Sequence, residues 1–280
     1  MPNRALPPGA REITCAGVLA KHADPGPTAL ISFTDEEILA LVQDPEAEGI
    51  ELPWIEAESA AENGFDREQA RRSALRSLIV RGVVGPENVI AQLEQREPRP
   101  EESPLTANSL ATGIITRRRA AAGTVRAADA REERNGSLLL FIDRDGTVLH
   151  EQVSADGLHH FVMENLEVAA EALQSFALRE LTGSVESTED AAAGTVAWAG
   201  PRTELLGTGL PEALPEMTAC TRITSVGAAE GELWVASDGT RVVLAQPADD
   251  GDQVEIVVVD REVLAEAIRE LLALPATDLD

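Results

Sequence analysis

The chain has 280 residues, 44% of them hydrophobic, which is enough for one large domain or two small ones with a sizeable core. Its formal net charge is −26, so its surface repels nucleic-acid phosphates and anionic membranes, and neither is an expected partner. The same charge would be expected if most proteins of the source cell are acidic, so the charge by itself does not indicate a function. Tyr is absent and aromatic residues make up 3%, so the core must consist of Leu, Ile, Val and Ala.

The N-terminal residues lack the apolar run of a signal peptide, and no stretch approaches the roughly 18 apolar residues of a membrane span. We therefore expect a cytoplasmic protein. Cys15 and Cys220 are isolated and offer no zinc or redox motif. Two buried free thiols are the expected state, with a bridge between them as the alternative. We expect no metal and no cofactor.

The first elements are two strands and a short helix. Apolar patterning predicts strands at 12–20 and 28–33, on either side of a Pro- and Gly-containing turn. The run Thr34-Asp-Glu-Glu37 has the pattern of a capping box, in which Thr34 is the N-cap and Glu37 the third helical residue. A short helix should therefore follow Thr34.

Two more helices are expected before a linker. One begins after Asp66 and runs to Arg81, where Gly82 ends it. Pro86 is placed to open the next. The segment 94–104 is rich in Pro, Glu and Arg, which is typical of a linker.

The rest of the chain is dominated by strands. We expect them at 112–119, 122–128, 137–142, 147–153 and 158–162, and again at 195–199, 219–226, 231–237, 241–246 and 253–259. An apolar stripe predicts a helix after the first set, with Leu166, Ala169, Leu173 and Phe176 on one face. Residues 180–194 read as a loop, and Asp260 is the expected N-cap of a final helix.

The two sets of strands resemble each other in sequence. Asp145-Gly146-Thr147 and Asp238-Gly239-Thr240 each stand between two β-type runs, where Asp-Gly is a strong hairpin signal. We expect an α+β fold, an antiparallel β-sheet with helices, in which 137–177 and 232–273 are pseudo-repeated β-units, each closed by a C-terminal helix. The predicted lobes are 1–180 and 181–280, forming one compact unit.

An apolar strand leading to Asp143-Arg-Asp145-Gly-Thr resembles the first motif of haloacid-dehalogenase-type phosphatases. The resemblance implies Asp143 as nucleophile and Asp145 as general acid/base, with magnesium. That family also has a downstream Lys or Arg and a parallel sheet, whereas the only lysine here, Lys21, lies upstream. The second Asp-Gly-Thr has Ala236 in place of the nucleophile, so a plain turn explains both copies. A magnesium-dependent phosphatase stays as the alternative function.

Neither the histidines nor the basic run predicts a site. His159 and His160 are adjacent in a predicted strand, so their rings point to opposite faces, which suits shared metal binding poorly. His150 could meet one of them across strands. The run 117–119 is three arginines, and helices before it could imitate a winged helix-turn-helix, but the net charge disfavours DNA.

The order of features from Ser32 to about Ala177 resembles the EspG-like family of ESX (type VII) secretion-associated proteins. A strand runs into a helix at 31–39, and Gly49-Ile-Glu-Leu-Pro53 follows. An Arg-, Ala- and Leu-rich helix then leads to Arg81-Gly82-Val-Val84. A sheet closes with a helix, and this plan returns in the last third of the chain.

This resemblance implies a non-enzymatic cytosolic chaperone or adaptor. Its partner would be a protein, a helical secretion substrate, bound through an interface with an apolar centre and a polar rim. The long segment 94–104 and the heavy negative charge depart from the family pattern. The resemblance gives neither the partner-binding residues nor the oligomeric state.

Overall fold

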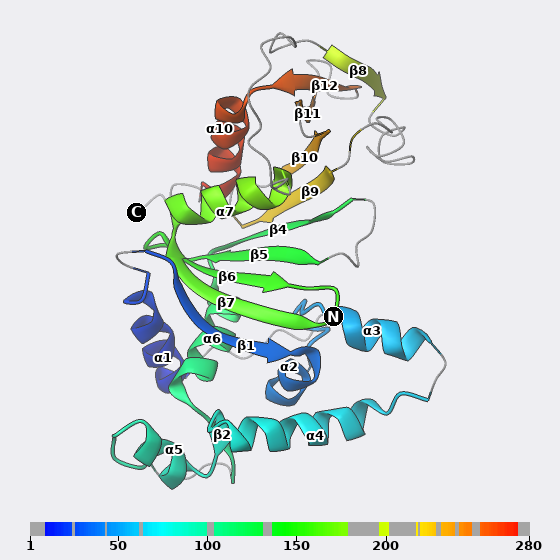
Figure 1. The fold of residues 1–280 in the computed structure, drawn as a ribbon. Coiled ribbons are helices and arrows are strands. Elements are labelled where there is room, and N and C mark those ends of the chain that lie inside the picture. Colours follow the sequence, from blue (N-terminus) through cyan, green and yellow to red (C-terminus); the bar gives the residue numbers. More distant parts are fainter. Residues whose placement is uncertain are drawn as a thin grey trace. The chain divides into compact units, whose positions relative to one another are not determined.

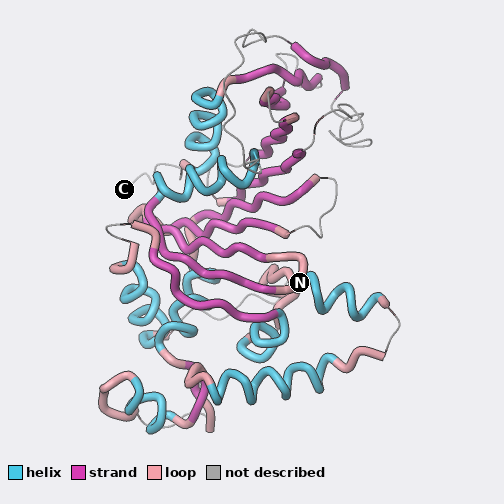
Figure 2. The backbone as a smooth tube through the Cα atoms, in the orientation of Figure 1, coloured by secondary structure: helices cyan, strands magenta, loops and turns pink. Residues whose placement is uncertain are grey.

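The structure is a computed structural model that describes residues 9–23, 26–42, 44–61, 64–99, 104–130, 136–178, 196–201, 217, 219–227, 231–238, 241–247 and 253–273. As predicted, the fold is α+β, with helices and a large antiparallel sheet (Figures 1 and 2). By its internal contacts the chain forms two compact units. The first comprises Met1–Ala121 and Thr147–Asn165, and the second comprises Ala122–Gly146 and Leu166–Asp280.

The first unit combines six helices of its described residues with a sheet built around β7. Its elements are α1 (Ala10–Ala20), β1 (Thr28–Thr34), α2 (Asp35–Leu41), α3 (Pro53–Ala60), α4 (Arg67–Val80), β2 (Val84–Gly85), α5 (Glu87–Leu93), β3 (Thr106–Ala107), α6 (Ser109–Ala120), β6 (Thr147–Val153) and β7 (Leu158–Asn165). Strand β7 pairs antiparallel with β1 on one side and β6 on the other, and β2 pairs with β3.

The predicted helix ends of this unit are confirmed. The capping box at α2 is complete, because Glu37 N donates to Thr34 Oγ1 at 3.3 Å and Thr34 N donates to Glu37 Oε2 at 3.4 Å. Asp66 caps α4 through two backbone N–H groups, each 3.0 Å from its Oδ1. Gly82, with φ +69°, follows the end of α4, and Pro86 precedes α5. These local signals are sufficient because capping depends on neighbouring residues only.

Two expected strands are wrong: 12–20 and 112–119 belong to the helices α1 and α6, which pack against each other. A Cβ on Gly113 of α6 would lie 2.8 Å from the carbonyl oxygen of Cys15 and 2.7 Å from Leu19 Cδ1, both in α1. The glycine therefore lets the two helices approach closely. Close packing overrides the strand preference of the β-branched residues in both segments.

The second unit holds a seven-stranded antiparallel sheet in the order β5-β4-β9-β10-β11-β12-β8 and two helices. Its elements are β4 (Gly123–Asp129), β5 (Ser137–Ile142), α7 (Leu166–Leu178), β8 (Val196–Pro201), β9 (Ala219–Val226), β10 (Gly231–Ser237), β11 (Val242–Pro247), β12 (Gln253–Val259) and α10 (Arg261–Leu272). Asp260 caps α10, as predicted, by accepting a hydrogen bond of 2.8 Å from Val263 N.

The order of three strands and a helix is the same in the two segments expected to be repeats, β5-β6-β7-α7 and β10-β11-β12-α10. The internal repeat itself stays a prediction. So does the lobe boundary near residue 180, since the predicted loop 180–194 lies outside the described residues.

Candidate functional site

Four buried ionisable side chains meet in the first unit and are named here the His159 cluster: Asp35 in α2, Arg118 in α6, Glu151 in β6 and His159 in β7. His159 Nε2 lies 2.9 Å from Asp35 Oδ1, and its Nδ1 lies 2.6 Å from Glu151 Oε1. Arg118 Nε lies 2.8 Å from Glu151 Oε2. None of the four side chains is more than 5% exposed.

The contacts of the His159 cluster favour a protonated imidazole. Ionised carboxylates only accept hydrogen bonds, so both ring nitrogens of His159 must donate. Burial alone would lower the pKa of His159, but its bonds to Asp35 and Glu151 outweigh burial and raise that pKa. Burial likewise tends to raise the pKa of Glu151, and the charges of Arg118 and His159 bring it below its ordinary value. Two basic side chains thus face two acidic ones in the interior.

Asp35 joins the His159 cluster to the start of α3. Its Oδ2 accepts hydrogen bonds from Trp54 N at 2.9 Å and Ile55 N at 3.1 Å, two otherwise unpaired groups of the first turn. Asp35 N donates to Gly157 O at 2.8 Å. Gly157 has φ +74°, and a Cβ there would lie 2.8 Å from Asp35 Cγ. Every member is buried, and through these contacts the cluster holds α2 and α3 in position.

Glu37 links two segments that the sequence analysis singled out. Its carboxylate caps α2 and also accepts a hydrogen bond of 2.8 Å from Ser77 Oγ of α4. Arg81 Nη1 donates to the same carboxylate at 2.5 Å, and Arg81 Nη2 donates to Ser32 O at 2.9 Å. The end of α4 is therefore held against the junction of β1 and α2.

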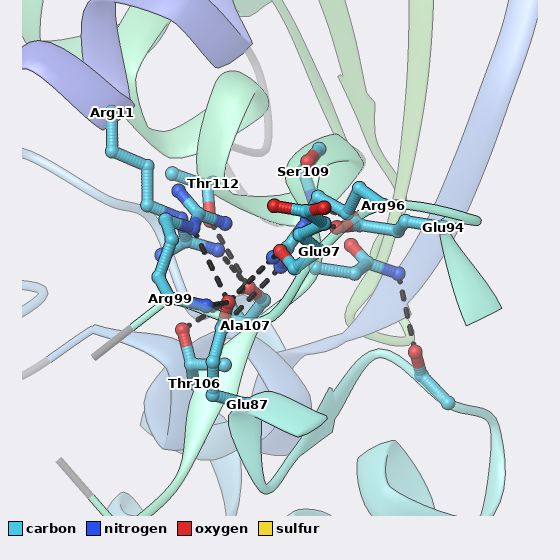
Figure 3. Close-up of polar contacts among 12 residues, drawn as sticks. Arg11, Glu87, Glu94, Arg96, Glu97, Arg99, Thr106, Ala107, Ser109 and Thr112 are labelled. Atoms are coloured by element: carbon cyan, nitrogen blue, oxygen red, sulfur yellow. Dashed lines mark hydrogen bonds and ion pairs between the residues drawn. The ribbon is translucent and has the colours of Figure 1, made fainter. Parts of the chain in front are cut away.

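A second ionic group, named here the Glu87 cluster, consists of Glu87, Arg96 and Arg99 and holds the segment after α5 in place (Figure 3). Arg96 Nη1 donates to Glu87 Oε1 at 2.5 Å, and Arg99 reaches the same oxygen through its Nε at 3.2 Å and its backbone N at 3.0 Å. The bond from Arg96 is the main reason why the pKa of Glu87 falls to about 2. Glu94 accepts from Ser109 N at 2.5 Å at the start of α6. The expected linker 94–104 has no helix or strand at 94–99, as predicted, but ionic contacts hold this part against α5, and residues 100–103 lie outside the described part.

Asp143 and Asp145 lie in the turn after β5. Gly146 N donates to Asp143 O at 3.0 Å, and Gly146 has φ +80°, so the Asp-Gly pair makes the predicted turn. The preceding strand β5 pairs antiparallel with β4, whereas the phosphatase family has a parallel sheet. In the second copy, Asp238 accepts hydrogen bonds of 2.8 Å from Arg241 N and Nε. These surroundings lend no support to the phosphatase alternative.

The three arginines of the run 117–119 each contact groups of the protein itself. Arg117 donates to Ala16 O at 3.0 Å and to Thr147 Oγ1 at 2.9 Å. Arg118 belongs to the His159 cluster, and Arg119 pairs with Glu48, with Nε 2.9 Å from Oε2. Because the segment is a helix rather than a strand, these side chains fan out around α6, and they form no common basic surface.

The remaining histidines and the cysteines make internal contacts. His159 is buried and His160 exposed, as predicted for neighbours in a strand, and His150 Nδ1 lies 3.0 Å from Glu164 Oε1. No disulfide joins the two buried thiols Cys15 and Cys220. Among the described residues, no three His, Cys, Asp or Glu side chains are grouped to hold a metal ion.

A groove of about 950 Å³ lies between α7 and α10 in the second unit. Gln174 Nε2 donates to Arg261 O at 2.9 Å and joins the two helices. Leu178 is buried in the groove and Ala265 half-buried. The exposed lining residues include five charged ones: Arg261, Glu262, Glu266, Arg269 and Glu270. The groove thus has a small apolar part and a charged margin.

The fold and its surfaces define an α+β protein with an open groove and two internal ionic clusters. No protein-family model matches the chain, and no curated protein matches it either. Among solved structures, it is similar to EspG5, a type VII secretion system chaperone of Mycobacterium tuberculosis solved in complex with a PE25–PPE41 dimer. The TM-score is 0.47 at 10% identity, over 89% of this chain and 98% of that chain. A likeness at this level assigns neither family nor partner.

In the described ranges, no helix is both long and apolar enough to cross a membrane.

Proposed function

We propose that this protein is a non-enzymatic, cytoplasmic chaperone or adaptor that binds a helical substrate of type VII secretion, keeps it soluble and delivers it. The order of features between Ile31 and Val84 carries the proposal, since it is the order in which the sequence resembles the EspG-like family. A contact between the two ends of this run of features supports the proposal. Arg81, from the end of the run, binds Glu37, from its beginning.

The charge of the chain supports the same function. A net charge of −26 keeps a protein soluble, and a chaperone must keep its client soluble as well. The negative charge also repels nucleic acid and anionic membranes, so neither is expected to compete with the client for binding to this protein.

The groove between α7 and α10 is the surface we propose for the client. Ala265, half-buried in the lining, offers apolar contact to a helix laid between α7 and α10, and the charged margin offers polar contact. Arginine at Ala265 would place a long cationic side chain in this groove. Arginine at Val263, which lies on α10 but outside the groove lining, is the matched control.

The first test is purification of the tagged protein from its native cytosol, with the associated proteins identified by mass spectrometry. We expect a small helical protein in near-stoichiometric amount, lost from Ala265→Arg and retained by Val263→Arg. Absence of any enriched protein at physiological salt would contradict the chaperone function. Retention of the client by Ala265→Arg would contradict only the groove.

The phosphatase alternative is tested with Asp143→Asn. We expect this variant to bind the client like the wild type, and we expect neither protein to turn over phosphate esters in the presence of magnesium. Turnover by the wild type that Asp143→Asn abolishes would show an enzyme.

A further inference from the structure

Four large apolar side chains of the first unit are exposed, two at the end of α4 and two on α5. Figure 1 shows these two helices on either side of β2. Ile79 and Val80, in the last turn of α4, are 42% and 87% exposed. Val89 and Leu93, one turn apart on α5, are 44% and 61% exposed. A Cβ on Gly82 would lie 3.1 Å from Leu93 Cδ1, so the exposed face of α5 adjoins the end of α4. Together with Arg72 and Arg76, these four residues are named the α4–α5 surface.

The α4 part of this surface is basic in an acidic protein. Helix α4 carries four arginines and one acidic residue, Glu68, in a chain with a net charge of −26. Arg72 pairs with Glu68 at 3.0 Å, a surface contact of little strength. The exposed Arg76, one turn before Val80, forms no ion pair with any residue that the structure describes. A positive charge is thus available beside the apolar side chains.

The spacing of exposed side chains along α4 suits a helical partner. Arg72, Arg76 and Val80 follow one another at intervals of four residues and share one face of α4. A helix lying along that face would meet two arginines and then the exposed side chain of Val80. Its own face must therefore be acidic beside the arginines and apolar beyond them.

We propose that the α4–α5 surface binds an acidic amphipathic helix of a partner protein. Charge complementarity selects this partner, because most of the protein's own surface repels acidic chains and this surface attracts them. The inference does not depend on the proposed function. It concerns the first unit, whereas the client groove lies in the second.

The test uses the full-length protein and two labelled helical peptides with the same leucine positions, one with glutamates on the polar face and one with lysines. Binding is followed by fluorescence anisotropy at low and at physiological salt. We expect the glutamate peptide to bind, with an affinity that falls as salt rises. We expect Val80→Asp and Arg76→Glu each to weaken it by about tenfold or more.

The matched control is Val18→Asp, which introduces the same charge at an exposed valine of α1 in the same unit and should leave the affinity unchanged. Circular dichroism establishes that all three variants are folded. The proposal is overturned if neither peptide binds, if both bind equally, or if Val80→Asp and Val18→Asp behave alike. A wild-type dimer that Val80→Asp converts to a monomer would also overturn it, since a second copy would then occupy the surface.

Discussion

Asp35 and His159 lie 124 residues apart in the sequence, yet Asp35 Oδ1 is 2.9 Å from His159 Nε2 in the interior of the first unit. Asp35 uses its other oxygen to bind the start of α3, and His159 uses its other nitrogen to bind Glu151. This contact therefore connects two helices to two strands through charged groups. Charges of this kind are costly to leave without a partner once buried.

Substituting Asp35 with Asn should destabilise the first unit strongly. The variant removes one of the two anions that face the buried imidazolium, and we expect the free energy of unfolding to fall by about 3–5 kcal/mol. Urea unfolding measures the change. The control Glu68→Ala breaks an exposed ion pair with Arg72 and should cost at most about 0.5 kcal/mol. Equal effects of the two variants would mean that the Asp35 contact contributes nothing beyond a surface pair.

His159 should make stability depend on pH. Because its pKa is raised in the folded state, its contribution is fully present below the unfolded value of about 6.5 and is lost as pH rises through the folded pKa. His159→Gln should therefore be less stable than the wild type at low pH, with a difference that narrows as pH rises. Urea unfolding at a series of pH values gives both curves, with His160→Gln as the exposed control. Parallel curves for His159→Gln and the wild type would contradict the protonated cluster.

Alanine substitutions at Gly157 and Gly146 distinguish two causes of lost stability, which are backbone strain at positive φ and steric overlap of the added methyl group. Both have positive φ, but a Cβ at Gly146 meets no atom within 4 Å, whereas at Gly157 it would lie 2.7 Å from Trp54 Cβ. We expect Gly146→Ala to cost about 1 kcal/mol from the backbone alone and Gly157→Ala about 2–4 kcal/mol. Thermal unfolding of both variants measures the difference. A similar loss in each would show that the contacts around Gly157 adapt freely.

Glu87 should contribute to resistance against acid. Its pKa falls from 4.5 to about 2 on folding, so its contribution is present above pH 4.5 and is lost as pH falls toward 2. Glu87→Gln should lower stability at neutral pH, and its difference from the wild type should narrow below pH 4.5. Acid titrations followed by circular dichroism compare it with Glu46→Gln, which alters an exposed pair with Arg67. A difference that widens on acidification would contradict this contribution.

The sequence was sufficient for features that depend on near neighbours. The caps of Thr34, Asp66 and Asp260, the stop at Gly82 and most of the strands were predicted correctly, because each is encoded within a few residues. It failed for α1 and α6, where close packing at Gly113 decides the conformation and the local composition favours strands.

The two ionic clusters could not be predicted from the sequence, for a different reason. Asp35 reads as an ordinary acidic residue in the first turn of a helix, and nothing local connects it to His159. Likewise, 94–99 has the composition of a linker, and only the folded chain shows that Arg96 and Arg99 return to Glu87. Such contacts join distant segments, and a single sequence carries no signal for them.

The path of the chain through the two units has a consequence for its synthesis. The chain leaves the first unit at Ala121 and returns to it at Thr147, so β6 and β7 are the last parts of that unit to be made. Until Asn165 has left the ribosome, β1 has no strand beside it and Asp35 has no imidazolium. A nascent chain that stops at Ala121 should therefore resist folding. The buried Asp35 in the first half of the polypeptide gains its basic partner only when this later segment has been synthesised.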